Sequence, residues 1–168
     1  MLPLILASAS PRRRELLDCL GVAFEVVTAD IDESRQPGEA PPALVQRLAR
    51  SKALAVAERR PGYPVLGADT IVVLEAAVLG KPADAAEATA MLRSLRGRAH
   101  WVWSAVYAWN PLSGRQATAL NGSQVWMRHY RDDEITCYVA GGDPLDKAGA
   151  YAIQHAGFAP VMRINGCY

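Results

Sequence analysis

Residues 4–16, LILASASPRRREL, change within a few positions from an apolar run to small residues and then to consecutive arginines. The apolar start is typical of a short buried strand. Ser10 followed by Pro11 is a helix start signal, because serine favours the N-cap and proline the first helical position. The stretch therefore predicts a strand, a tight loop and a helix. The apolar face of that helix is expected to consist of Leu16, Leu17 and Leu20.

The arginines Arg12, Arg13 and Arg14 stand at the end of this helix where the helix dipole is already positive. Each cation in a first turn costs about 0.3–1 kcal/mol against that dipole, and a bound anion would reverse the sign. Free backbone N–H groups of the small-residue loop, which includes Ser8, and forked guanidinium donors suit phosphate oxygens. The stretch therefore indicates a phosphate site. A solvated basic helix start is the alternative, and Arg14 is expected to be a surface residue.

The composition excludes several classes of protein. The 168 residues carry a net charge of +1, with 51% hydrophobic and 21% charged residues, as in an ordinary globular protein. This charge balance argues against nucleic acid as a partner, and no apolar run has the length of a membrane span. Cys19, Cys137 and Cys167 are widely spaced and no secretory signal precedes them, so we expect a cytoplasmic location.

Asp69 is unusual because it interrupts an apolar run that predicts a strand over residues 65–74. A buried carboxylate is costly unless it is paired or binds metal. Asp69 is therefore a candidate general base or metal ligand, with a satisfied structural carboxylate as the alternative. Gly67, two residues earlier, permits a bulge or a close backbone approach. Lys52 lies on the apolar stripe of a helix predicted over residues 43–59, and such a lysine needs an anion nearby.

Further charged residues extend this set. Lys81 lies between a glycine and a proline, and Lys147 lies in the segment DPLDKAG. Each alone is more often a surface lysine, but together with the arginines and the helix lysine they could match a triphosphate. Asp32 and Glu33 lie in a polar loop and offer carboxylates for Mg²⁺, which prefers oxygen ligands and substrate phosphates. The alternative is that they are ordinary acidic residues of a turn.

The rest of the chain mixes predicted strands and helices. Asp84 and Glu87 form a capping signal for one helix, and residues 100–109 alternate as in a strand. The aromatic face of this strand, a core or a homodimer surface, consists of Trp101, Trp103, Tyr107 and Trp109. A further strand is predicted over residues 151–153. This mixture indicates an α/β or α+β fold.

The order of several short motifs resembles one known family. LILASASPRRRELL, the loop with Asp32 and Glu33, RLARSKA, LGADTIV, LGKP and DPLDKAGAYAIQ follow one another along the chain. This pattern resembles the Maf family of nucleoside triphosphate pyrophosphatases over the whole chain. The resemblance implies an α/β fold with an elongated mixed sheet flanked by helices. It also implies a cleft between two lobes, within a single domain of residues 1–168.

The resemblance also implies roles for individual residues. It places the catalytic carboxylate, which accepts a proton from the attacking water, on Asp69, and it makes Glu33 and Asp69 the metal-side acids. The phosphate-binding positions fall on Arg13, Lys52 and Lys81, to which the pattern of the residues adds Ser8 and Lys147. The positions that separate the subfamilies by base fall on Arg12, Thr70 and Gln154.

The implied reaction is the hydrolysis of a nucleoside triphosphate to the monophosphate and pyrophosphate, with Mg²⁺ or Mn²⁺. The paired arginines, the threonine after the aspartate and AGAYAIQ resemble the branch that acts on dTTP and UTP, which we therefore expect. The alternatives are the same chemistry on 7-methyl-GTP or another modified nucleotide, and a catalytically weak, nucleotide-binding regulator of cell division. Members of the family usually continue past the segment that matches residues 164–168, so a truncated carboxy-terminal element is also expected.

Overall fold

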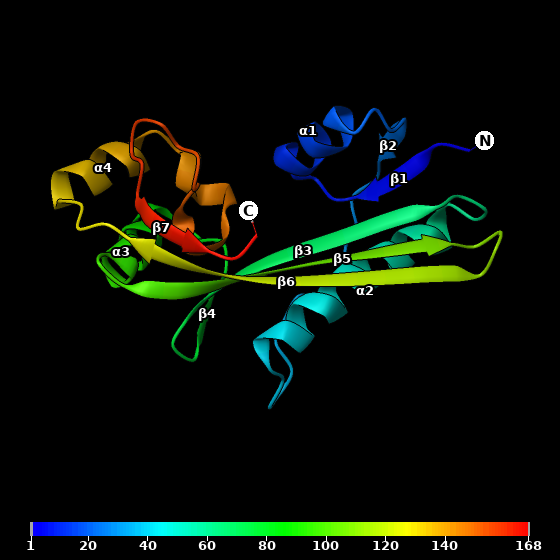
Figure 1. Cartoon of the computed structure of the whole chain (residues 1–168), viewed down its shortest axis with the longest axis horizontal. Coiled ribbons are helices and arrows are strands. Elements are labelled where there is room, and N and C mark those ends of the chain that lie inside the picture. The colour runs from blue at the N-terminus through cyan, green and yellow to red at the C-terminus, as the bar shows by residue number, and fades with distance from the viewer. Residues whose placement is uncertain (1, 168) are drawn as a thin grey trace. The chain divides into compact units, whose positions relative to one another are not determined.

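The computed structural model describes residues 2–167 and has a mixed α/β architecture (Figure 1). The strands are β1 Leu4–Ala7, β2 Phe24–Val26, β3 Val65–Leu74, β4 Ala77–Leu79, β5 Ala99–Asn110, β6 Arg115–Met127 and β7 Val161–Asn165. The helices are α1 Pro11–Cys19, α2 Pro41–Arg59, α3 Ala85–Leu95 and α4 Asp132–Ala140, with 3₁₀ turns at Asp143–Asp146 and Ala148–Ala150. None of the helices in the described part of the chain is long and apolar enough to cross a membrane.

The strands form one seven-stranded mixed sheet, which confirms the predicted fold class. The strand order is β2-β1-β3-β5-β6-β7, with β4 paired to β3 outside this path. β1 runs parallel to both β2 and β3, while the β3–β4 and β6–β7 pairs are antiparallel. The parallel register sets Ala7, the last residue of β1, opposite Gly67 of β3. The end of β1, where the arginine-bearing segment begins, therefore lies beside β3 just before Asp69.

The contacts divide the chain into two compact units, and some strands contribute to both. The first unit comprises Met1–Asp69 and Ser104–Leu120, and the second comprises Thr70–Trp103 and Asn121–Tyr168. The second unit has its own apolar core, built on α3, α4 and the end of β6. The expectation of a single domain with a cleft between two lobes stays a prediction.

The helix α2 confirms the predicted apolar stripe. It begins at Pro41, and Val45, Leu48, Ala49 and Val56 are buried at helical spacing. Lys52 falls on the same stripe, so the helix presents one ammonium group among its buried side chains. The predicted close approach at Gly67 is also confirmed, because a Cβ atom built on this glycine would lie 2.2 Å from the Ala49 carbonyl oxygen.

The helix α1 begins at Pro11 as predicted, but its predicted apolar face is wrong. Only Leu17 is buried, whereas Leu16 and Leu20 are 65% and 73% exposed. Residues four apart share a helix face, and the buried side of α1 carries Leu17 together with Arg13. Ser10 occupies the N-cap position but makes no side-chain capping bond.

The predicted strand at residues 151–153 is also wrong. This segment forms turns after the 3₁₀ turn Ala148–Ala150, where Gly149 and Ala150 have φ angles of 69° and 59°. Left-handed backbone of this kind interrupts a strand. Tyr151 and Ala152 are nevertheless buried, and the Ala152 N–H donates to the Tyr138 hydroxyl at 3.1 Å. A side chain thus supplies the acceptor that a neighbouring strand would otherwise provide.

By contrast, the predicted helix cap at Asp84 is confirmed by its bond from the Glu87 N–H at 2.8 Å.

Candidate active site

The turn between β1 and α1 forms a hydrogen-bonded corner around Ser8. Ser8 Oγ accepts a hydrogen bond from the Ser10 N–H at 3.3 Å and another from Arg13 Nη1 at 3.0 Å. Arg13 Nη1 also donates to the carbonyl oxygen of Ala68 on β3 at 2.7 Å. Arg13 therefore links α1 to β3 directly beside Asp69. These contacts hold Arg13 on the inner side of α1, whereas the predicted Leu16 and Leu20 are exposed.

The consecutive arginines have different surroundings. Arg13 is half-buried, while Arg12 and Arg14 are exposed on the first turn of α1. Burial lowers the pKa of Arg13 from its ordinary value, although the negative charges of Asp69 and Glu33 oppose that change. A guanidinium remains charged in proteins, so the corner keeps a positive charge that faces two carboxylates. The phosphate role of this corner stays a prediction.

Lys52 joins two carboxylates that lie far apart in the sequence. Its Nζ atom lies 2.5 Å from Asp69 Oδ1 and 2.9 Å from Glu33 Oε1. Asp69 projects from β3 and is only 7% exposed, whereas the Glu33 side chain is 57% exposed. Lys52, on the apolar stripe of α2, therefore contacts the buried Asp69. The loop before α2 places Glu33 at the same ammonium group.

Burial raises the pKa of Asp69 above its ordinary value. The charge of Lys52, its hydrogen bond and the charge of Arg13 act in the opposite direction, while the charge of Glu33 adds to the increase. The net direction is upward. Asp69 is therefore a stronger proton acceptor than an exposed aspartate, which is the change expected of a carboxyl that serves as a general base near neutral pH.

Glu33 and Asp69 also form a donor set that fits a divalent cation. Both carboxylates already contact one positive group, the Lys52 ammonium. Within the described residues, no group of three or more His, Cys, Asp or Glu side chains could hold a metal ion by itself. Mg²⁺ is commonly bound by one or two carboxylates together with water and substrate phosphates. The two acids therefore fit a cation that shares its ligands with a bound phosphate.

The remaining predicted site residues belong to the second unit. They are Thr70, Lys81, Lys147 and Gln154. Thr70 is half-buried on β3, and Lys81 and Gln154 are exposed. The Gly80 carbonyl oxygen, just before Lys81, accepts a hydrogen bond from the Gly149 N–H at 3.0 Å. This bond joins the LGKP motif to the AGAYAIQ motif within the second unit.

Lys147 is held by acceptors of its own segment. Its Nζ atom lies 2.6 Å from the Asp143 carbonyl oxygen, 3.1 Å from Asp143 Oδ1 and 2.6 Å from Asp146 Oδ1. An ammonium group has three N–H donors, so a phosphate oxygen would have to replace one of these acceptors. The spacing of the acids in DPLDK contained this signal, because lysine and aspartate four residues apart face each other on a helical turn.

The first unit thus brings together half of the predicted site residues. Ser8, Arg13, Glu33, Lys52 and Asp69 are linked by hydrogen bonds or ion pairs. The Ala68 carbonyl oxygen is a member of this set that sequence analysis missed. A main-chain acceptor carries no residue-type signal, so only its position beside Asp69 could have suggested it.

Comparison with known proteins identifies the family. The model of the Maf-like protein family matches residues 3–168, and the chain belongs to this family. Among curated relatives, a dTTP/UTP pyrophosphatase of Myxococcus xanthus (strain DK1622) is 52% identical over 164 residues, which cover 97% of this chain and 82% of the relative. A dTTP/UTP pyrophosphatase of Escherichia coli O157:H7 is 50% identical over 169 residues, covering 100% and 85%. One of Pelotomaculum thermopropionicum is 44% identical over 168 residues, covering 100% and 88%.

Proposed function

We propose that this chain is a nucleoside triphosphate pyrophosphatase that hydrolyses dTTP and UTP to the monophosphate and pyrophosphate. The observation that carries the proposal is the contact between the buried Asp69 and Lys52, with Glu33 on the same ammonium. This arrangement places a candidate general base, the Asp69 carboxylate, beside a cationic group, the Lys52 ammonium. The relatives named dTTP/UTP pyrophosphatase, which are about half identical to this chain, support the substrate assignment.

Asp69 is the proposed proton acceptor. A water oxygen attacks the α-phosphorus of the triphosphate and forms the new P–O bond. The anhydride bond between the α- and β-phosphates breaks, and its electron pair stays with the oxygen of the leaving pyrophosphate. The proton of the water passes to Asp69 and then to solvent. The raised pKa of Asp69 supports this role, because it increases the affinity of the carboxylate for that proton.

Cationic and polar groups would bind the rest of the substrate. The proposed phosphate contacts are Ser8, Arg13, Lys52, Lys81 and Lys147, whose charges and donors would stabilise the negative charge of the transition state. The proposed contacts to the nucleotide base are Arg12, Thr70 and Gln154, which offer a guanidinium, a hydroxyl and an amide group, respectively. A site that hydrogen-bonds one base rejects others strongly, because a wrong base leaves buried polar groups unpaired.

A divalent cation, Mg²⁺ or Mn²⁺, completes the proposal, and Glu33 and Asp69 would hold it. When bound, such a cation neutralises phosphate charge. Lys52, which contacts both acids, would then be available to bind a phosphate oxygen.

The first test measures pyrophosphate release with Mg²⁺ or Mn²⁺ from dTTP, UTP, CTP, 7-methyl-GTP and the common purine triphosphates. We expect selective turnover of dTTP and UTP. Turnover of 7-methyl-GTP alone would contradict the base assignment and retain the chemistry. Tight nucleotide binding without turnover, by protein shown to be folded, would favour a nucleotide-binding regulator.

A second test concerns the coupling of Lys52 to Asp69. In Lys52→Gln we expect the acid limb of the profile of kcat/KM against pH to move upward by about one unit or more. The reason is that the ammonium lowers the pKa of Asp69, and activity is lost as the pH falls through that pKa. Ser51→Ala, at the neighbouring position of α2, is the matched control. An acid limb that keeps its wild-type position in Lys52→Gln would contradict the coupling.

The proposal also concerns partners and location. A nucleotide is the expected partner, nucleic acid is not, and the cytoplasm is the expected compartment. Trp101 and Trp103 of β5 stack with their ring centroids 5.4 Å apart, and Trp101 is 42% exposed. Exposed aromatic pairs are enriched at protein interfaces, so this pair is the candidate surface for a homodimer.

A further inference from the structure

The loop over residues 27–40 carries Glu33 but contains no helix or strand. Its attachment to α2 depends on Arg47. Arg47 Nε donates to Glu39 Oε1 at 2.7 Å, and Arg47 Nη2 donates to Glu39 Oε2 at 2.9 Å. The same Nη2 also donates to the Ser34 carbonyl oxygen at 2.9 Å. The Arg47 guanidinium thus binds the loop at Glu39, near the start of α2, and at Ser34, the residue that follows Glu33.

Glu39 makes further hydrogen bonds within the loop. Its Oε2 atom accepts the Gln36 N–H at 3.1 Å, and its carbonyl oxygen accepts Arg35 Nε at 2.8 Å. The Glu39 side chain is only 9% exposed, and the bonds from Arg47 are the main reason that its pKa falls to about 2. Glu39 is therefore charged throughout the physiological range. Paired, two-pronged contacts of this kind fix geometry as well as adding energy.

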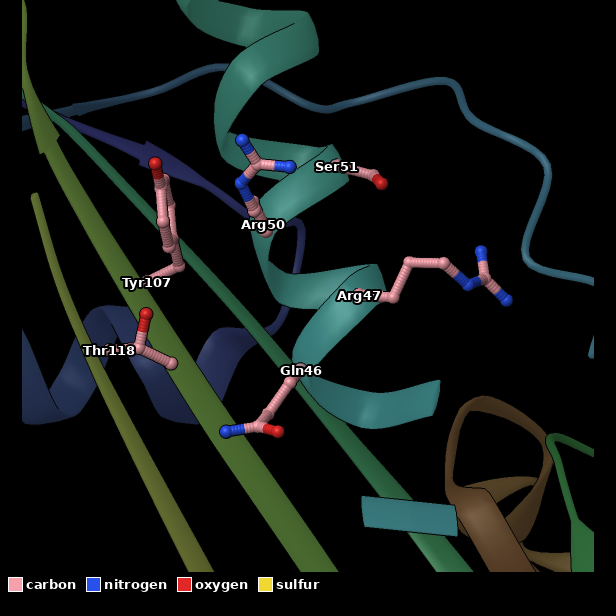
Figure 2. Close-up of a pocket in the computed structure, with 6 residues that line it drawn as sticks. All are labelled: Gln46, Arg47, Arg50, Ser51, Tyr107 and Thr118. Carbon is pink, nitrogen blue, oxygen red and sulfur yellow. The ribbon is translucent and has the colours of Figure 1, made fainter. Parts of the chain in front are cut away.

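A second arginine of the same helix, Arg50, lies against an aromatic ring. Arg47 and Arg50 both line a cavity of about 390 Å³, with Tyr107 of β5 and Thr118 of β6 on its other side. Figure 2 shows the Arg50 side chain turned toward Tyr107 and the Arg47 side chain turned away from it. The Arg50 guanidinium lies 5.9 Å from the centroid of the Tyr107 ring. The two arginines are thus one helical turn apart and have different surroundings.

We propose that Arg47 is a positioning residue that holds the 27–40 loop so that Glu33 meets Lys52 and the bound cation. The inference rests on the proposed function, because it assigns Arg47 a part in that same site. Arg47 acts through Ser34 and Glu39, which it contacts directly. Arginine is required here rather than lysine, since only a guanidinium can bind both oxygens of Glu39 and the Ser34 carbonyl in a fixed plane.

The first test of this inference needs no substrate. Amide hydrogen exchange is measured by mass spectrometry for Arg47→Gln and for the matched control Arg50→Gln. We expect faster exchange across residues 28–40 in Arg47→Gln and wild-type exchange in Arg50→Gln. Glu39→Gln, which weakens the same contact from the other side, is expected to behave like Arg47→Gln and serves if the arginine variant does not fold. Wild-type exchange of the loop in both Arg47→Gln and Glu39→Gln would overturn the proposal.

The second test separates positioning from general stability. Arg47→Gln is expected to raise the Mn²⁺ concentration for half-maximal dTTP turnover by about 10–100-fold, as is usual when a residue that orients a metal ligand is lost. Arg47→Lys should fall between this variant and wild type, and Arg50→Gln should match wild type. In a Glu33→Gln background the Arg47 substitution should add no further loss. A full additional loss in that background would show that Arg47 does not act through Glu33.

The proposed function can fail separately from this inference. If the wild-type protein turned over neither dTTP nor UTP, the proposed function would be wrong. The role of Arg47 would then be decided by loop exchange and by Mn²⁺ binding measured with electron paramagnetic resonance. Equal Mn²⁺ affinity of wild type and Arg47→Gln, together with unchanged exchange, would overturn it.

Discussion

The Asp69→Asn variant is expected to bind dTTP and to turn it over about 10²–10⁴-fold more slowly than wild type. Asparagine has nearly the same shape and its amide oxygen can still accept the bond from Lys52, but it cannot take a proton from water. The ammonium is not left without a counter-ion, because Glu33 Oε1 remains 2.9 Å away. The substitution therefore removes the proposed base and weakens one proposed ligand of the cation, while the contact between Lys52 and Glu33 stays in place.

The measurements are kcat for pyrophosphate release and, separately, the affinity of the variant for dTTP by calorimetry. The matched control is Asp18→Asn, an exposed carboxylate of α1 in the same unit, and it should behave like wild type. The thermal midpoint of each variant shows whether it is folded. An Asp69→Asn protein that released pyrophosphate at the wild-type rate would remove Asp69 from the mechanism.

The sequence predicted the burial of Asp69 and an anion beside Lys52 because each residue breaks a strong local pattern. Asp69 interrupts an apolar run, and Lys52 falls on the apolar stripe of a helix at a spacing that fixes the side on which it lies. Burial of the strand and of the stripe then forces the two charges inward. Their contact at 2.5 Å follows from two local rules and the packing of one helix on one strand.

The errors concern features that local periodicity does not contain. The buried side of α1 carries Arg13, which bonds to the Ala68 carbonyl oxygen 55 positions away. Local periodicity contains no trace of this long-range bond. The turns at residues 151–153 follow from the left-handed backbone just before them, and for Ala150 nothing in the residue type predicts this. The attachment of the loop by Arg47 likewise joins a helix to an irregular segment. Periodic patterns predict elements, but they do not predict which main-chain oxygen a side chain will reach.

The Gly67→Ala variant is expected to be strongly destabilised, although one methyl group is the only change. The added Cβ would lie 2.2 Å from the Ala49 carbonyl oxygen and 2.8 Å from the Ala53 backbone nitrogen. These are main-chain atoms of α2, which cannot rotate away as a side chain can. Overpacking of a core costs about 1–3 kcal/mol, and a clash with helix backbone belongs at the upper end. For a chain of this size each kcal/mol lowers the melting temperature by about 2–4 °C.

The same clash should affect the site more than the fold. Lys52 lies between Ala49 and Ala53 on α2, so a shift of this helix away from β3 also moves the ammonium away from Asp69. We therefore expect kcat/KM of Gly67→Ala to fall further than its folded fraction at the assay temperature. Gly80→Ala is the control for stability, because open space surrounds its Cβ position. A Gly67→Ala protein with wild-type melting temperature would contradict the close packing of α2 on β3. Activity that fell only in proportion to the folded fraction would show that the site tolerates a shift of α2.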